Sequence, residues 1–172
     1  MPFIRIKKIS NKNYAYLVEN TWKKRKKASR QKSLKYLGRV FEIEKSKQNP
    51  FIFNNNESFQ ENLIRVIKNE IVNFEFENKE NIFIKDNFVI DFEKKKVFSN
   101  KNNKGISLKL NDGFLNSYTL SCLINYQPKG DSNQIAFNLA NSFVVAGIHV
   151  EKEDFIELYS KLINEHGLNF DI

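Results

Sequence analysis

The chain has 172 residues, of which 41% are hydrophobic, 28% charged and 13% aromatic, and this composition excludes a wholly disordered protein. No apolar run approaches the roughly 20 residues that a membrane-spanning helix needs, and the charged N-terminus carries no secretory signal pattern. The single cysteine, Cys122, excludes an intramolecular disulfide and a cysteine zinc cage. We therefore expect a reducing, cytoplasmic setting.

Positive charge is concentrated near the N-terminus. The formal net charge is +8, yet residues 1–48 hold 15 Lys and Arg against 3 acidic residues, and residues 112–172 hold 3 against 8. A/T-rich codon usage favours Lys, Asn, Ile and Phe and so explains part of the lysine excess. It would spread lysine evenly and disfavour arginine, however, and every arginine except Arg65 lies in the first 39 residues. The asymmetry predicts a basic interaction module joined to a folded body.

Residues 1–48 are predicted to form this module as a small antiparallel sheet. Its strands are expected over residues 3–9, 14–22 and 31–43. A four-residue polar turn and a basic loop join them, over residues 10–13 and 23–27. The third strand is expected to bend at Gly38, because glycine inside a strand marks a bulge or a bend.

Residues 49–172 are predicted to form an α+β body, consisting of a helix, a short antiparallel sheet and a three-helix C-terminal part. Ser58 and Glu61 form a capping-box pattern before a helix over 59–73. Short strands are expected over residues 82–85, 88–92, 97–99 and 106–110. The C-terminal helices are expected over residues 111–126, 132–146 and 151–166. The linker-like stretch before the first of these helices contains Phe51 and Phe53, which predict that it packs on this body.

The sequence offers little for catalysis or for a cofactor. It has no phosphate-binding glycine motif, and Cys122 lies among leucines in a predicted helix, which is typical of a small buried side chain. Asp86, Asp91 and Glu93 could hold magnesium if they converged, although turn positions explain them more simply. The sequence leaves enzymatic activity open, favours a non-enzymatic role, and identifies no catalytic residue, metal or cofactor.

The basic module has the composition of a nucleic-acid-binding surface, because its cations alternate with aromatic residues. The candidate contacts are Arg5, Lys7, Lys12, Tyr14, Tyr16, Trp22, Lys23, Lys24, Arg25, Lys26, Lys27, Arg30, Lys32, Lys35 and Arg39. Strand alternation places the aromatic residues of the second strand on one face. That face could stack bases, or it could face the core while the lysines only solvate the sheet.

One stretch resembles a known family. Tyr-Ala-Tyr-Leu-Val-Glu-Asn at residues 14–20 is followed by a basic loop, by Arg-Gln-Lys at 30–32 and by Lys-Tyr-Leu-Gly-Arg-Val at 35–40. This pattern, within about residues 3–44, resembles the N-terminal segment of some insertion-sequence transposases and of small uncharacterised archaeal proteins. In the transposases it precedes an RNase H-like catalytic domain, which nothing after residue 50 matches. The resemblance implies a strand-loop-strand accessory module that contacts nucleic acid and carries over no catalytic residue.

Two functions follow from these patterns. The first is a non-enzymatic protein that binds DNA, RNA or a ribonucleoprotein through the basic module. The alternative is a protein-interaction adaptor in which the acidic C-terminal helices bind a basic partner and the basic module binds an acidic surface, including that of a second copy. Its candidate contacts are Glu151, Glu153, Asp154 and Glu157. Phosphates repel these carboxylates, so we do not expect the last two helices to read DNA as a helix-turn-helix.

Overall fold

The structure, a computed structural model, describes residues 2–23 and 28–167 of the chain. It has the expected α+β fold. The N-terminal strands are β1 (Phe3–Ile9), β2 (Lys12–Lys23) and β3 (Ala28–Glu42). The later strands are β4 (Glu77–Lys79), β5 (Ile82–Lys85), β6 (Phe88–Asp91), β7 (Lys96–Ser99), β8 (Lys104–Leu110) and β9 (Gly113–Leu115). The helices are α1 (Phe59–Asn73), α2 (Ser117–Ile124), α3 (Ser132–Ala146) and α4 (Lys152–Glu165).

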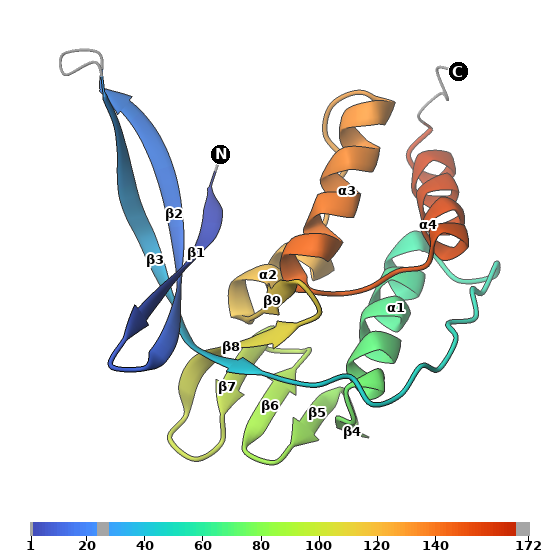
Figure 1. The fold of residues 1–172 in the computed structure, drawn as a ribbon. Coiled ribbons are helices and arrows are strands. Elements are labelled where there is room, and N and C mark those ends of the chain that lie inside the picture. The colour runs from blue at the N-terminus through green and yellow to red at the C-terminus, as the bar shows by residue number, and fades with distance from the viewer. Residues whose placement is uncertain (1, 24–27, 168–172) are drawn as a thin grey trace.

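Within the described residues, all strands belong to one mixed sheet of nine, in the order β1-β2-β3-β8-β7-β6-β5-β4, with β9 also paired to β8. Neighbouring strands are antiparallel except for β3 and β8, which run parallel where Arg39–Glu42 pair with Ile106–Lys109. The helices cover one face of the strands from β4 to β9 (Figure 1). The short pairing of β3 with β8 therefore joins the N-terminal strands to the rest of the sheet.

We call β1, β2 and β3 the arm. Ser10 and Asn11 connect β1 to β2 with φ angles of 46° and 60°, as in the two-residue turns that match the twist of a hairpin. The connection is thus shorter than the expected four-residue turn, since β2 already begins at Lys12. β2 and β3 extend away from the helices (Figure 1). Upstream of Arg39, the described part of β3 pairs with β2 alone.

The main core lies between α1, the sheet and the C-terminal helices. α1 has the predicted bounds and the predicted capping box, in which Ser58 and Glu61 satisfy each other's backbone N–H groups. Its side chains Leu63, Ile67 and Ile71 are fully buried, as their helical spacing predicts. The capping box and the apolar stripe together specify both the start and the direction of this helix.

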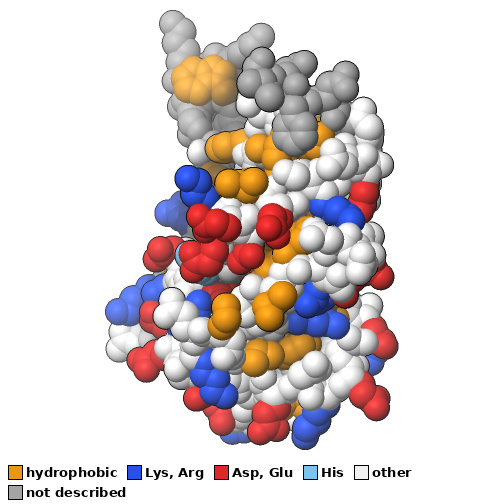
Figure 2. Space-filling model, turned by 90° about the vertical axis from the view of Figure 1, so that its right-hand side faces the viewer, with side chains coloured by type: hydrophobic (Ala, Val, Ile, Leu, Met, Phe, Trp, Pro, Cys, Tyr) orange, Lys and Arg blue, Asp and Glu red, His pale blue; other side chains and the backbone are white. Residues whose placement is uncertain are grey.

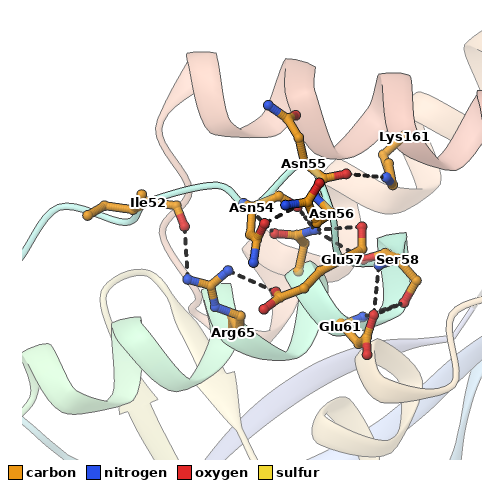
Figure 3. Close-up of polar contacts among 10 residues, drawn as sticks. Ile52, Asn54, Asn55, Asn56, Glu57, Ser58, Glu61, Arg65 and Lys161 are labelled. Carbon is orange, nitrogen blue, oxygen red and sulfur yellow. Dashed lines mark hydrogen bonds and ion pairs between the residues drawn. The ribbon is translucent and has the colours of Figure 1, made fainter.

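The stretch before α1 has no regular structure, yet it is held firmly against two helices (Figure 3). The Arg65 guanidinium forms an ion pair of 2.8 Å with Glu57 and donates to the Ile52 carbonyl at 3.1 Å. From α4, Lys161 donates to the Asn55 carbonyl at 2.8 Å. Phe51 and Phe53 pack against the core, which confirms the prediction made for them.

The C-terminal elements differ from the prediction at one point. Residues 113–115 form β9, and α2 begins only at Ser117, because the Asn116 side chain accepts hydrogen bonds from the Tyr118 and Thr119 N–H groups. α3 begins after Asp131 and ends at Gly147, whose φ is +73°, as expected. The short strand β4 was also not predicted as a strand. No described helix is long and apolar enough to cross a membrane.

Candidate nucleic-acid interface

Tyrosines and cations of the arm share one face. The register pairs Arg5 with Tyr16 and Lys7 with Tyr14 across β1 and β2, and it pairs Tyr16 with Tyr36 across β2 and β3. Residues directly opposite each other in antiparallel strands point to the same side of the sheet. The Tyr36 ring centroid lies 5.3 Å from that of Tyr16 and 6.4 Å from that of Tyr14. We call this side of the arm the aromatic face.

The opposite face of the arm is the one that packs inward. Ala15, Leu17 and Leu37 are buried there, and Tyr118 of α2 packs against them. The two β-bulges between β2 and β3 shift the pairing next to Ala15 and Leu17, and bulges increase the twist of a strand pair. The apolar residues therefore pack the arm on α2 and leave Tyr14, Tyr16 and Tyr36 outside both hydrophobic clusters, although Val18 on the same face is buried. This rejects the interpretation that these tyrosines are core residues.

Cations are held close to the aromatic rings. The Lys7 ammonium lies 4.8 Å from the Tyr16 ring centroid, and the Arg39 guanidinium lies 4.7 Å from that of Phe41. Arg5 donates a hydrogen bond to the Gln31 side chain. Partial burial raises the pKa of Tyr36, and Tyr16 and Tyr14 raise it further. Tyrosine ordinarily ionises well above neutral pH, and the raised pKa of Tyr36 moves its ionisation further away, so the ring adds no negative charge that would repel phosphates.

The candidate cations are exposed and distributed over both faces of the arm. Those on the aromatic face, by register and alternation, are Arg5, Lys7, Lys12 and Arg39. Those on the opposite face are Arg30, Lys32 and Lys35. In the described part of the chain, no ion pair joins any of these cations to a carboxylate. Their charge is thus available to an anionic ligand.

The remaining candidates of the module are Trp22 and the five basic residues that follow it, and the structure describes only the first of these side chains. Trp22, near the far end of β2, is 64% exposed and lies on the aromatic face by alternation with Tyr14 and Tyr16. For Lys23 only the backbone is described. The predictions for Lys24, Arg25, Lys26 and Lys27 fall outside the described residues.

A cleft opens where β3 separates from β8. Gly38 has φ +105°, and a Cβ added there would lie 2.4 Å from the Gly105 carbonyl oxygen. The missing side chain of Gly38 thus lets β3 approach β8 closely at this point. Before it in the chain, the described part of β3 pairs only with β2, so β2–β3 and β7–β8 diverge like the two sides of a fork. The resulting cavity of about 660 Å³ is bounded by β3 between residues 35 and 41, by the β7–β8 turn between residues 99 and 106, by the start of α2, and by Tyr14. We call it the fork cleft.

The fork cleft adds residues that the sequence did not indicate. Asn102 lines it from the β7–β8 turn, Lys104 from the start of β8, and Phe41 from β3. Together with Lys35 and Arg39 they combine positive charge, an amide and an aromatic ring. No Asp or Glu among the described residues lines the cleft. Only the pairing of β3 with β8 brings Lys104 here, and no local pattern around residue 104 indicates that pairing.

The three carboxylates considered for magnesium binding, Asp86, Asp91 and Glu93, do not converge in the structure. Among the described residues, no group of three or more His, Cys, Asp or Glu could hold a metal ion. Asp91 is buried and accepts a hydrogen bond of 2.9 Å from the Lys94 N–H, whereas Asp86 and Glu93 are exposed in separate turns.

Cys122 is exposed, so the prediction of a buried side chain is wrong. The reason is its place on α2, where the neighbouring Leu123 and not Cys122 faces the core.

The acidic residues at the start of α4 form one patch on the side of the molecule away from the arm. Figure 2 shows acidic side chains gathered on this side. Glu151, Glu153 and Glu157 are exposed. Burial raises the pKa of Asp154, and repulsion from Glu157, Glu151 and Glu153 raises it further. This direction of shift is what crowded like charges produce.

Comparison with known proteins adds no further information. No protein-family model, curated protein or solved structure matches the chain.

Proposed function

We propose that this chain is a nucleic-acid-binding protein whose arm contacts phosphates with its cations and bases with its tyrosines. The observation that carries the proposal is the aromatic face, where Tyr14, Tyr16 and Tyr36 lie beside Arg5 and Lys7 outside the core. Single-stranded nucleic acids are bound by this combination, in which positive charge follows the backbone and aromatic rings stack on bases.

Two observations about the distribution of charge support this function. The described cations of the arm are exposed and form no ion pair with a carboxylate among the described residues, so no such pair is broken when an anion binds. Lysine and arginine bind phosphates without selecting a sequence, so we expect weak sequence preference. The acidic patch on α4 lies away from the arm, which leaves phosphates free to approach the aromatic face without local repulsion.

The decisive experiment uses the single tryptophan, Trp22, as a reporter on the arm. Oligonucleotides of DNA and RNA, single- and double-stranded, are titrated while Trp22 fluorescence and the anisotropy of a labelled strand are recorded at several salt concentrations. We expect binding that weakens with salt and changes Trp22 emission. If about six cations meet phosphates, raising salt from 50 to 200 mM lowers affinity on the order of a thousandfold.

A charge-matched pair of variants locates the binding surface. Arg5→Ala combined with Lys7→Ala removes two cations from the aromatic face and should weaken binding several-fold. Lys79→Ala combined with Lys152→Ala removes two exposed lysines from β4 and α4 and should leave affinity unchanged. Equal effects of the two pairs would mean that net charge, and not the arm, governs binding, which contradicts the proposal.

A second candidate function is self-association through opposite charges. The acidic patch on α4 and the basic arm lie at opposite sides of the molecule (Figures 1 and 2), a geometry that allows head-to-tail contacts between copies. Sedimentation velocity at low and high salt tests this function. We expect larger species at low salt only, and Glu153→Gln combined with Glu157→Gln should remove them. A single salt-independent species would reject this function.

A further inference from the structure

The fork cleft lies directly beside the aromatic face, and the two share Tyr14, Tyr36 and Arg39. We propose that the fork cleft holds one unpaired nucleotide, so that the arm binds single strands and strand ends in preference to continuous duplex. This inference rests on the proposed function and specifies the form of nucleic acid that the same surface takes.

The size of the cleft suits a single unpaired nucleotide better than a base-paired one. Its volume of about 660 Å³ lies in the range of small-ligand sites, about 300–1,000 Å³. A base inside a duplex is stacked above and below and cannot enter a pocket unless it is turned out of the helix, which costs unpairing and unstacking. An unpaired base at an overhang or in a single strand enters without that cost.

The cleft has groups that suit both the base and the phosphate of a nucleotide. Tyr36 lines the cleft and is 53% exposed, so its ring is accessible for stacking by an unpaired base. Lys35, Arg39 and Lys104 line the same cavity with no carboxylate among its described residues, so a phosphate is attracted and not repelled. The Asn102 side-chain oxygen accepts from the Lys104 N–H at 3.1 Å. The nitrogen of the same amide is a donor of the kind that a base edge or a phosphate accepts from.

The two walls of the cleft are joined at its base, where β3 pairs with β8. The Ser107 hydroxyl donates to the Leu37 carbonyl at 2.9 Å where β3 meets β8, and Ser107 is fully buried. Below this point, Arg39–Glu42 run parallel to Ile106–Lys109. The two walls of the cleft therefore start from one hydrogen-bonded junction, which sets how the backbone at Lys35 lies relative to that at Lys104.

Three labelled probes of equal phosphate number test the proposal by anisotropy on the full chain at constant salt. They are a blunt DNA duplex, a duplex with a single-stranded overhang, and a single strand. We expect the single strand and the overhang to bind at least fivefold more tightly than the blunt duplex. Equal affinity for all three probes overturns the cleft proposal while leaving nucleic-acid binding in place. No binding of any probe overturns the proposed function as well.

Variants then assign the preference to the cleft. Removing one stacking ring typically costs about 1–3 kcal/mol per base, so Tyr36→Ala should lower overhang affinity by about tenfold and blunt-duplex affinity far less, whereas Tyr36→Phe should retain the preference. Lys104→Glu, at an exposed position on β8, should also reduce overhang binding selectively. Phe137→Ala and Lys79→Glu are the matched controls, at exposed sites on α3 and β4. Equal losses for overhang and duplex in the Tyr36 and Lys104 variants would overturn the proposal.

Discussion

The Lys45 ammonium lies 2.9 and 3.0 Å from the two carboxylate oxygens of Glu70. Glu70 is only 3% exposed, and the Asn111 and Asn73 side chains also donate to it, at 2.9 and 3.3 Å. Lys45 follows β3, Glu70 belongs to α1, and Asn111 follows β8. One buried carboxylate therefore ties the chain leaving the arm to the first helix and to the strand that β3 pairs with.

Replacing Glu70 should be among the most damaging changes to the body. Glu70→Ala leaves Lys45, Asn73 and Asn111 without their shared acceptor. Because the Lys45 side chain is 25% exposed, its ammonium stays partly hydrated, and we expect a loss of about 1–3 kcal/mol, as for buried polar groups left without a partner. Urea denaturation followed by circular dichroism measures this loss in the free energy of unfolding. Glu77→Ala, at an exposed position on β4, is the control and should change stability little. A loss below about 1 kcal/mol for Glu70→Ala would contradict the role assigned to this carboxylate.

Gly38 should tolerate no side chain. Gly38→Ala forces a residue with a Cβ into φ +105° and places that atom 2.4 Å from the Gly105 carbonyl oxygen. Strain of this kind costs about 1–3 kcal/mol, and relieving it separates β3 from β8. We expect a lower melting temperature and weaker binding of the overhang probe. Gly105→Ala is the matched control, because its Cβ meets only the Val97 carbonyl oxygen at 3.9 Å, and it should behave nearly as wild type.

The salt dependence of binding should count the phosphate contacts. On a single strand, each cation that contacts a phosphate contributes about 0.7 to the slope of log affinity against log salt. The triple variant Arg5→Ala, Lys7→Ala and Arg39→Ala should therefore reduce the slope by about 2. Anisotropy titrations at four or more salt concentrations give this slope. An unchanged slope with reduced affinity would show that these cations act on the fold of the arm and not on phosphates.

The acidic patch on α4 should make stability depend on pH. Because burial and neighbouring carboxylates raise the pKa of Asp154 above 3.8, the folded state holds this proton to a higher pH than the unfolded chain does. The resulting stabilisation is present below 3.8 and is lost as the pH rises through the raised pKa. Asp154→Asn cannot ionise, so its stability relative to wild type should increase from pH 3 to pH 7.

Urea denaturation at both pH values checks this expectation, and Glu77→Gln on β4 controls for the removal of one negative charge. The same rise in relative stability for both variants would indicate a general effect of net charge. A fall for Asp154→Asn would mean that its ionised form is stabilised by the helix start and not penalised by its neighbours.

Local signals account for what the sequence predicts well. Ser58 and Glu61 act within one helical turn, and Asp131 and Gly147 bracket α3 by their own side-chain and backbone chemistry. The alternation of Tyr14 and Tyr16 with Ala15 and Leu17 likewise specified the two faces of β2. These features depend on residues close together in the chain, so their structure follows from short patterns.

Distant contacts account for what the sequence did not predict. Asn111 resembles a helix cap, but its side chain donates to Glu70 and to the Gly147 carbonyl, and Asn116 caps α2 instead. Lys104 joins the candidate site only through the pairing of β3 with β8. Two parallel strands are joined by a long connection, so the residues next to either strand in the sequence do not indicate which residues will pair.

The parallel pairing of β3 with β8 also has a consequence for synthesis. The hairpins of the arm close locally, whereas β3 meets its second neighbour only after α1 and four further strands have been made. Until then the newly made chain presents an open strand edge, which is a site for mispairing between molecules. Charged side chains on such an edge discourage mispairing, so we expect the exposed Lys35 and Arg39 of β3 to disfavour mispairing of the nascent chain.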